Sequence, residues 1–208
     1  MGRRIGPVCR TCRKEGEKLF LKGRRCDTAR CAFTKRGTPP GEHPYRRVRR
    51  KGYGLQLREK QKMKSFYGIL DRQFKRYFKQ AAMQKGNTGE NLLILIERRL
   101  DNAVYLLRLA SSRPQARQLV RHGHIYVNDR RCDVPSRLVE PGNIIAVHGG
   151  EKIQNVVKEN LEQMRSREIP KWLQLDENNL TGTVSELPAR LDVSLPVEEQ
   201  MIVELLSR

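Results

Sequence analysis

The amino-acid sequence predicts a helix-rich α+β fold, and three observations lead to that prediction. Apolar residues repeat at helical spacing through most of residues 53–110 and again through 151–167. Between residues 124 and 147, short apolar runs alternate with Pro, Gly and Asn-Asp turns, which is typical of short strands. Residues 1–45 contain four cysteines and few apolar side chains, so hydrophobic burial alone would not hold this segment folded.

The four cysteines of the first segment are Cys9, Cys12, Cys26 and Cys31, in the pattern C-x2-C-x13-C-x4-C. Two close pairs separated by a loop can surround one zinc ion with four thiolates. Neighbouring arginines would lower the thiol pKa values and offset the negative charge of the site. The pattern therefore predicts one structural zinc ion, with an iron–sulfur cluster or four unligated thiols as the alternatives. Cys132 stands alone in a strand pattern and is expected to be a buried small residue.

Helical periodicity continues after a basic connector, "RRVRRK", at residues 46–51. The pattern predicts one helix over 53–66 and a second over 70–85, with Gly68 between them. Residues 91–110, "NLLILIERRLDNAVYLLRLA", are predicted to be helical in two pieces, with Asp101 placed to cap the second.

The stretch "ARQLVRHGHIYVN", residues 116–128, predicts a helix that passes directly into a strand. Ser112 is a candidate N-cap and Gly123 a candidate C-terminal stop. Ala116, Leu119 and Val120 would form the buried face, while Arg113, Arg117 and Arg121 recur every fourth residue along a neighbouring stripe. Asn128-Asp129 predicts the turn after the strand. His122 and His124 flank Gly123, and we expect them to contact RNA or to have a structural role rather than to bind metal.

Further short strands are predicted through residues 130–147, followed by the helix at 151–167. The tail mixes strand-like pieces with an apolar end at 200–206 that fits either a helix or a strand.

The charge of the chain points to a polyanionic partner. The 42 Lys and Arg residues against 23 Asp and Glu give a net charge of +19. Residues 1–65 hold 21 basic and five acidic residues, whereas residues 151–208 hold seven basic and 11 acidic residues. Nucleic acid is the commonest such partner, because neutralised phosphates release counterions. Cations on helices and loops, with only 6% aromatic residues, favour a folded RNA over a single strand bound mainly by stacking.

Membrane, secretory and enzymatic classes find no support in the sequence. No apolar run approaches a membrane span, and "MGRRIGPVC" lacks a hydrophobic signal core, so we expect a cytoplasmic protein. No glycine-rich phosphate loop, nucleophile elbow, H-E-x-x-H or paired-carboxylate motif is present. We therefore expect neither catalysis nor a small-molecule substrate.

Several motifs together resemble one family. "RLDNAVYLLRLASSRPQARQLVRHGHIYVN" resembles the S-four RNA-binding module, a helix pair followed by a small sheet. "GPVCRTCRKEG", "LREKQKMKSFYGI", "RQFKRYF" and "PVEEQMIVELLSR" are similar to the bacterial small-subunit ribosomal protein S-four family, in its cysteine-containing, zinc-binding form. Asn128-Asp129 stands where that family has Asn-Gly, so the turn geometry there is not implied by the resemblance.

The resemblance implies three parts. Residues 1–45 would be a zinc-binding basic extension, and residues 46–98 a helical domain that the segment 170–208 completes. Residues 99–169 would be the inserted S-four module, a helix pair plus a small antiparallel sheet, with the helix that follows it.

The resemblance also implies a function. The protein would be a structural constituent of the small ribosomal subunit, binding the 5′ domain of its RNA directly and early in assembly. It would contact ribosomal protein S-five and other small-subunit proteins, contribute to translational accuracy and, in some bacteria, repress its own mRNA. The alternatives that carry the same module are an RNA-modifying enzyme of the pseudouridine synthase type and a free translational repressor.

Charge and resemblance together predict a set of RNA-contacting residues. Those in the basic amino-terminal part are Arg3, Arg4, Arg10, Arg13, Arg46, Arg47, Arg49, Arg50, Lys51, Arg58, Lys60, Lys62 and Lys64. The positions that match the RNA-facing helix and turn of the module are Arg113, Gln115, Arg117, Gln118, Arg121 and His122.

Overall fold

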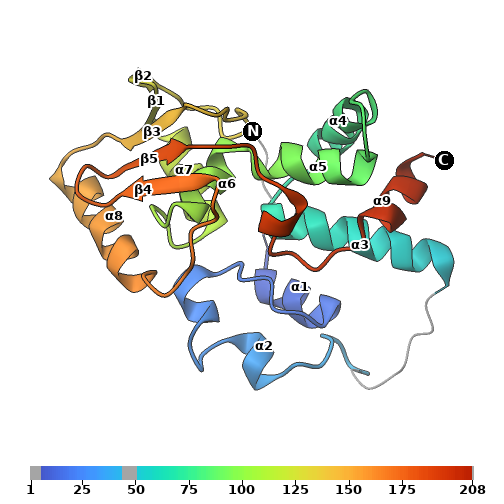
Figure 1. Ribbon diagram of the computed structural model, residues 1–208. Coiled ribbons are helices and arrows are strands. Elements are labelled where there is room, and N and C mark those ends of the chain that lie inside the picture. The colour runs from blue at the N-terminus through green and yellow to red at the C-terminus, as the bar shows by residue number, and fades with distance from the viewer. Residues whose placement is uncertain (1–5, 44–50, 208) are drawn as a thin grey trace. The chain divides into compact units, whose positions relative to one another are not determined.

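The computed structural model describes residues 6–43 and 51–207. The chain divides into two compact units, of which unit 1 comprises Met1–Leu92 with Ser194–Arg208 and unit 2 comprises Leu93–Val193. Figure 1 shows the helices and strands that these units contain. Across the two described ranges, no helix is both long and apolar enough to cross a membrane.

Unit 1 is helical in its described part. Its elements are α1 (Val8–Glu15), the 3-10 turn η1 (Gly23–Cys26), α2 (Ala32–Lys35), α3 (Gly52–Tyr67), α4 (Asp71–Ala82), the start of α5 (Thr88–Glu97) and α9 (Glu199–Leu206). The helices predicted over 53–66 and 70–85 are confirmed as α3 and α4. Gly68, with φ at 64°, ends α3 in the left-handed conformation that glycine adopts without steric cost.

The apolar end of the chain is a helix because it packs along α3. Figure 1 shows α9 beside α3, and the two helices are in contact. Ile202 is fully buried, and the Gln56 side-chain amide donates a hydrogen bond of 2.7 Å to the Glu204 carboxylate. Contacts with α3 therefore decide between the two conformations that the sequence pattern left open.

Unit 2 packs helices on one antiparallel sheet. Its elements after α5 are α6 (Leu100–Leu106), α7 (Arg113–Arg121), β1 (Ile125–Val127), β2 (Arg130–Arg131), β3 (Ile144–Val147), α8 (Glu151–Gln163), β4 (Leu173–Asp176), β5 (Thr181–Val184) and the 3-10 turn η2 (Arg190–Asp192). The strand order is β2-β1-β3-β5-β4, with antiparallel pairing throughout. The helix-rich α+β fold with a small antiparallel sheet is thus confirmed.

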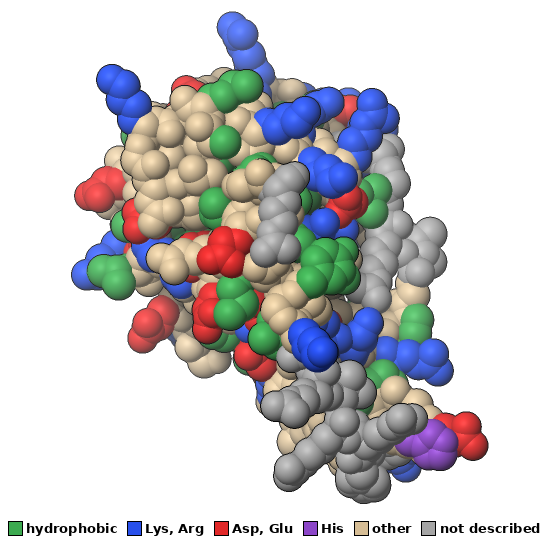
Figure 2. Space-filling model, turned by 90° about the vertical axis from the view of Figure 1, so that its right-hand side faces the viewer, with side chains coloured by type: hydrophobic (Ala, Val, Ile, Leu, Met, Phe, Trp, Pro, Cys, Tyr) green, Lys and Arg blue, Asp and Glu red, His purple; other side chains and the backbone are tan. Residues whose placement is uncertain are grey.

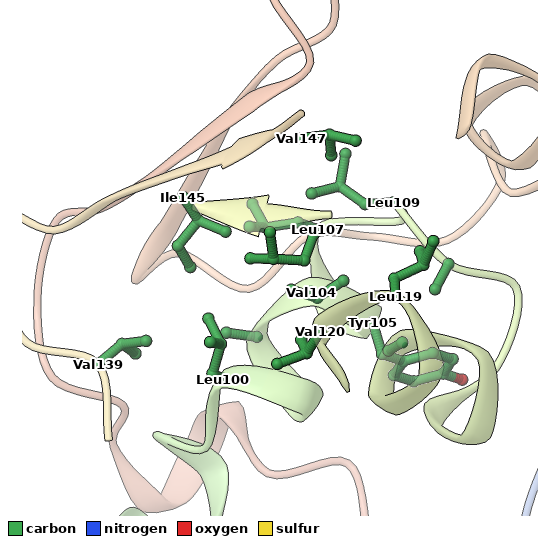
Figure 3. Packing of buried hydrophobic residues seen from close by; sticks show 14 of the residues in the cluster. Leu100, Val104, Tyr105, Leu107, Leu109, Leu119, Val120, Val139, Ile145 and Val147 are labelled. Carbon is green, nitrogen blue, oxygen red and sulfur yellow. The ribbon is translucent and has the colours of Figure 1, made fainter. Parts of the chain in front are cut away.

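The core of unit 2 lies between the helices and one face of the sheet. Figure 3 shows Val104, Leu107 and Val120 from the helical side close to Ile145 of β3. These four side chains are fully buried. Burial of apolar surface contributes about 25 cal/mol per Å², so this cluster is the main source of stability of the unit.

Local signals around α7 act as the sequence predicts. The Ser112 hydroxyl accepts a hydrogen bond from the Gln115 amide, and Gly123, with φ at 76°, follows the end of the helix. Asn128 and Asp129 have φ of 50° and 60°. Two successive positive φ values match the turn type that joins short antiparallel strands, so this Asn-Asp pair adopts the geometry that Asn-Gly commonly provides.

Two features of unit 2 differ from the sequence-based description. The break between α5 and α6 is present, but Asp101 does not cap α6, because Arg99 occupies the N-cap position and the Asp101 carboxylate binds the Arg99 guanidinium. Residues 170–208 were assigned as a whole to the helical domain. In the structure, β5 pairs with β3, so residues up to Val193 belong to unit 2 and only Ser194–Arg208 returns to unit 1.

Candidate nucleic-acid interface

Four cysteines of unit 1 line one small cavity. Cys9 and Cys12 lie on α1, Cys26 ends η1, and Cys31 is the residue before α2. All four thiols are free of disulfides, and three of them, those of Cys12, Cys26 and Cys31, are buried. The cavity that they share with Leu21 is otherwise lined mainly by apolar atoms and lysine side chains. Tertiary structure thus brings together two cysteine pairs that are separated by 13 residues in the sequence.

The thiols of this cluster differ in pKa. Burial, reinforced by the other thiols of the cluster, raises the pKa of Cys12 and of Cys26. The pKa of Cys31 is lowered, because hydrogen bonds from the backbone N–H groups of Thr34 and Phe33 outweigh the effect of burial. Thiolates this close repel one another, and a bound cation would remove that repulsion. Four sulfur donors around one cavity fit a tetrahedral Zn²⁺ ion or a four-cysteine cluster.

The cysteine side chains are not in a preformed coordination geometry. Among the residues that the structure describes, no three His, Cys, Asp or Glu side chains are arranged to hold a metal ion. Metal binding at the cysteine cavity would therefore require the sulfur atoms to move towards a common centre.

Cations surround a pocket next to this cluster. An open pocket of about 1110 Å³ is lined by Arg13, Arg24, Arg25, Thr28, Arg30, Ala32, Lys35 and Arg36. A smaller one of about 450 Å³ is lined by Arg10, Arg13, Arg36, Pro40 and Gly41. Because Arg13 and Arg36 line both, the two form one surface, which we call the basic groove. No acidic residue is among these lining residues, so the groove is suited to a polyanion.

The backbone that carries the cysteines also carries the groove. Arg13 follows Cys12, and Arg25 and Arg30 each precede a cysteine of the cluster. Two guanidinium groups are fixed by backbone carbonyls, since Arg13 Nε donates to Thr38 O at 2.9 Å and Arg25 Nε to Arg30 O at 3.3 Å. Adjacent residues point in different directions, so the thiols face the cavity while the cations line the groove. Of the residues that line the groove, only Arg10 and Arg13 are among the RNA contacts predicted from the sequence, and Arg24, Arg25, Arg30, Lys35 and Arg36 are not.

Further cations of unit 1 are exposed on α4. They are Arg72, Lys75, Arg76 and Lys79. Lys and Arg side chains project from the surface in several places on the face in Figure 2. These four residues are not among the predicted RNA contacts, because the prediction for residues 70–85 rests on their apolar repeat. In the sequence, these cations stand between the apolar positions of residues 70–85, and that placement is the signal of an exposed basic helix face.

The four cations predicted on α3 are held within the protein instead. Each makes an ion pair in unit 1: Arg58 with Glu15 at 3.1 Å, Lys60 with Asp71 at 3.3 Å, Lys62 with Glu17 at 2.8 Å and Lys64 with Asp71 at 2.8 Å. Lys60 and Lys62 are buried, and the Lys62 ammonium also donates to the Pro196 carbonyl. The hydrogen bond from Lys64 is the main reason why the pKa of Asp71 is lowered. Because burial of a charge is costly without a partner, these residues stabilise the packing around α3.

Arg113, predicted to face RNA, is buried at the start of α7. Its Nε donates a hydrogen bond of 2.8 Å to the Asn102 side chain, and its guanidinium lies 4.4 Å from the centre of the Tyr105 ring. Both partners belong to α6. Arg113 therefore fixes α7 against α6.

The other two arginines of the α7 stripe, Arg117 and Arg121, differ in how far they are exposed. Arg117 is partly buried and lies 3.3 Å from Asp101, whereas the Arg121 side chain is 55% exposed and its partner Asp133, at 3.5 Å, is exposed as well. Gln118 and His122 are exposed. The side-chain oxygen of Gln115 accepts hydrogen bonds from the Ser111 backbone N–H and hydroxyl. The outward surface of the helix end is thus formed by Gln118, Arg121 and His122.

The remaining predicted contacts are accounted for by position. Arg10 is exposed in the basic groove, and Lys51 is exposed just before α3. Arg3, Arg4, Arg46, Arg47, Arg49 and Arg50 lie outside the described residues.

The fold and the matched sequence segments define the class as a basic S4-domain protein. Residues 98–145 match the S4 domain family, and residues 3–97 match the family described as ribosomal protein S4/S9 N-terminal domain. The chain is 52% identical to the small ribosomal subunit protein uS4 of Thermoanaerobacter sp. strain X514, 53% identical to that of Pelotomaculum thermopropionicum and 50% identical to that of Thermodesulfovibrio yellowstonii. Each similarity covers 100% of both chains. This chain belongs to the uS4 family.

Proposed function

We propose that this protein is a structural constituent of the small ribosomal subunit in the cytoplasm, where it binds the 5′ domain of the small-subunit RNA directly and early in assembly. The observation that carries the ribosomal role is the similarity to uS4 proteins along the whole chain. The charge of +19 and the basic groove support direct contact with RNA.

Two surfaces are proposed to contact the RNA. The basic groove presents arginines and lysine without an acidic lining residue, which suits phosphates that approach from different strands of a folded RNA. The outward end of α7 adds Gln118, Arg121 and His122. Contacts to phosphates fix the position of a protein on RNA, so both surfaces serve placement within a folded RNA rather than the reading of a base sequence.

A single zinc ion held by Cys9, Cys12, Cys26 and Cys31 is proposed for unit 1, with an iron–sulfur cluster as the alternative. The shared cavity, which brings four sulfur donors together, supports a bound cation. Such an ion, when bound, would have a structural role and take no part in a reaction. Its positive charge would offset the repulsion between the thiolates, and its ligands would tie α1, η1 and α2 together. The basic groove depends on those same three elements, so the metal is proposed to maintain the RNA-binding surface.

Several partners are proposed from the family resemblance alone. They are ribosomal protein S-five, through an interface that affects translational accuracy, other small-subunit proteins and the protein's own mRNA. An RNA-modifying enzyme of the pseudouridine synthase type is the competing function, and a free translational repressor is another. The named relatives are small ribosomal subunit proteins, which favours the ribosomal role.

Sedimentation separates the ribosomal role from the free repressor. We expect the protein to remain with small subunits through a sucrose gradient after a moderate salt wash, because many phosphate contacts act together. Recovery of the protein in the free fraction, with none on small subunits, would contradict a structural role. Conversion of uridine to pseudouridine in bare ribosomal RNA by the purified protein would instead establish the enzyme.

Removal of two charges from the basic groove tests the RNA-binding surface. In the double variant Arg24→Ala/Arg30→Ala, we expect weaker binding to a 5′-domain transcript. The dependence of log K on log salt concentration should flatten by about one for each phosphate that the variant no longer binds. Filter binding at several salt concentrations measures both quantities.

The matched control is Lys152→Ala/Lys158→Ala, which removes the same charge from exposed positions on α8. Its dependence of log K on log salt concentration is expected to stay close to that of the unaltered protein. Equal flattening in both double variants would mean that net charge alone, and not the groove, determines binding.

A further inference from the structure

The outer face of the sheet in unit 2 carries a group of rings that the core does not use. Ile125 and Val127 of β1 point into the core, so Tyr126 between them points outward. His124 precedes β1 and His148 follows β3, and the His148 backbone N–H donates to the His124 carbonyl at 2.8 Å. That bond extends the pairing of β1 with β3 and sets both histidines beside Tyr126.

The rings form two close pairs on this face of the sheet. The Tyr126 and His148 ring centres are 4.2 Å apart with an interplanar angle of 38°, and those of His122 and His124 are 6.2 Å apart. His122 and His148 are exposed, and His124 and Tyr126 are half-buried. We call these four residues the ring platform. Aromatic faces in this arrangement offer a stacking area at little cost in side-chain entropy.

A cation is fixed at the edge of the ring platform. Arg131 is opposite Tyr126 in the pairing of β1 with β2, and its NH2 group donates to the His122 carbonyl at 3.4 Å. The guanidinium lies directly over Gly123, where a Cβ atom would come within 2.1 Å of Arg131 Nε. Glycine at this position therefore both ends α7 and makes room for the Arg131 side chain. The exposed Arg130 is its neighbour in β2.

We propose that the ring platform binds one unpaired nucleotide of RNA, with its base stacked on Tyr126 and His148 and its phosphate next to Arg131. Paired bases stack on one another and offer no free face, whereas an unpaired base presents a face to any aromatic surface. The positive charge of Arg131 beside the rings complements the negative phosphate of the nucleotide. The exposed end of α7 adjoins the platform at His122. This inference rests on the proposed RNA-binding function and adds a stacking contact to its phosphate contacts.

The test uses the full chain and a 5′-domain transcript in filter binding. Tyr126→Ala is expected to weaken binding about 5- to 150-fold, the range for loss of one stacked base. Because tyrosine is uncharged, the salt dependence should be unchanged. Tyr126→Phe retains the ring and should bind within about twofold of the unaltered protein. Arg131→Ala should flatten the salt dependence by about 0.7.

Two controls separate stacking from folding and from the broader function. Ile144→Ala removes an exposed apolar side chain from the same face of the sheet, outside the platform, and should bind normally. Chemical probing should show one unpaired base that loses protection in Tyr126→Ala and keeps it in Tyr126→Phe. Normal affinity and protection in Tyr126→Ala would overturn this inference alone. Failure of the unaltered protein to bind the transcript would overturn the proposed function, and the platform with it.

Discussion

Removal of the proposed zinc ion is expected to unfold the cysteine-containing segment, residues 6–43, and to leave unit 2 folded. Structural zinc contributes roughly 10 kcal/mol or more to the folding of a small motif, which exceeds what the few buried apolar residues of this segment supply. Apart from the cysteines, Leu19 is the one buried large apolar side chain in the described part of residues 6–43. Cys12→Ser should reproduce the effect of a chelator. RNA affinity should also fall on chelation and in Cys12→Ser, because the basic groove is built on the same backbone as the cysteines.

Elemental analysis and hydrogen exchange check this expectation. Protein purified without affinity-tag metal should carry one zinc per chain, and amides in the segment should exchange faster after chelation. Cys132→Ser is the matched control, since Cys132 is buried in unit 2, away from the cluster in sequence. It should not change the metal content. Less than about a tenth of an equivalent of zinc, with four titratable thiols, would contradict the site, and iron with visible absorbance would favour the cluster.

Asp101→Ala is expected to destabilise unit 2 by about 3–5 kcal/mol, the cost of leaving a buried charge without its partner. The Arg99 guanidinium is 2% exposed and donates two hydrogen bonds to the Asp101 carboxylate, at 3.0 and 2.7 Å. Arg117 approaches the same carboxylate at 3.3 Å. Loss of Asp101 would thus leave Arg99 buried without this partner and release α7 from one of its contacts with α6.

Urea unfolding followed by tryptophan fluorescence measures the loss. Trp172 is the single tryptophan of the chain and is buried in the core of unit 2, so its signal reports on that unit. Asp133→Ala removes an equally charged side chain from an exposed pair with Arg121 and should cost less than about 1 kcal/mol. Replacement of Arg99 and Asp101 together by apolar residues should recover much of the stability. Equal losses in the Asp101 and Asp133 variants would mean that the burial of the Arg99 pair contributes nothing.

The sequence predicted well the features that depend on neighbouring residues. The glycine stops after α3 and α7, the Ser112 cap and the turn at Asn128-Asp129 are local, because each depends on the φ angles or hydrogen bonds of two to four adjacent residues. Helical periodicity located α3, α4 and α8 for the same reason. The cap assigned to Asp101 was wrong because a partner at Arg99 competes for the carboxylate, and periodicity does not register such a partner.

The roles of the cations could not be predicted in this way. Lys62 and Arg113 look like any other basic residue of a helix, yet the structure buries both beside partners from other elements. In the sequence, Arg24 and Arg30 stand out only as neighbours of the cysteines, and the structure shows that they line the basic groove. Exposure and ion pairing depend on residues far away along the chain, so charge counts alone do not separate a surface cation from an internal one.

By itself, then, the sequence determined the α+β class, the positions of most helices and the strongly basic character of the amino-terminal part, because each follows from composition or short-range spacing. Only the tertiary structure decided that β4 and β5 join the sheet of unit 2, that the apolar end of the chain is a helix packed on α3, and which cations line the basic groove. These features depend on contacts between segments far apart along the chain, such as Gln56 with Glu204 and Ile145 with Gly182. Such contacts form only when the whole chain has folded, because their energy comes from burial and pairing between elements and not from the local preferences of either one.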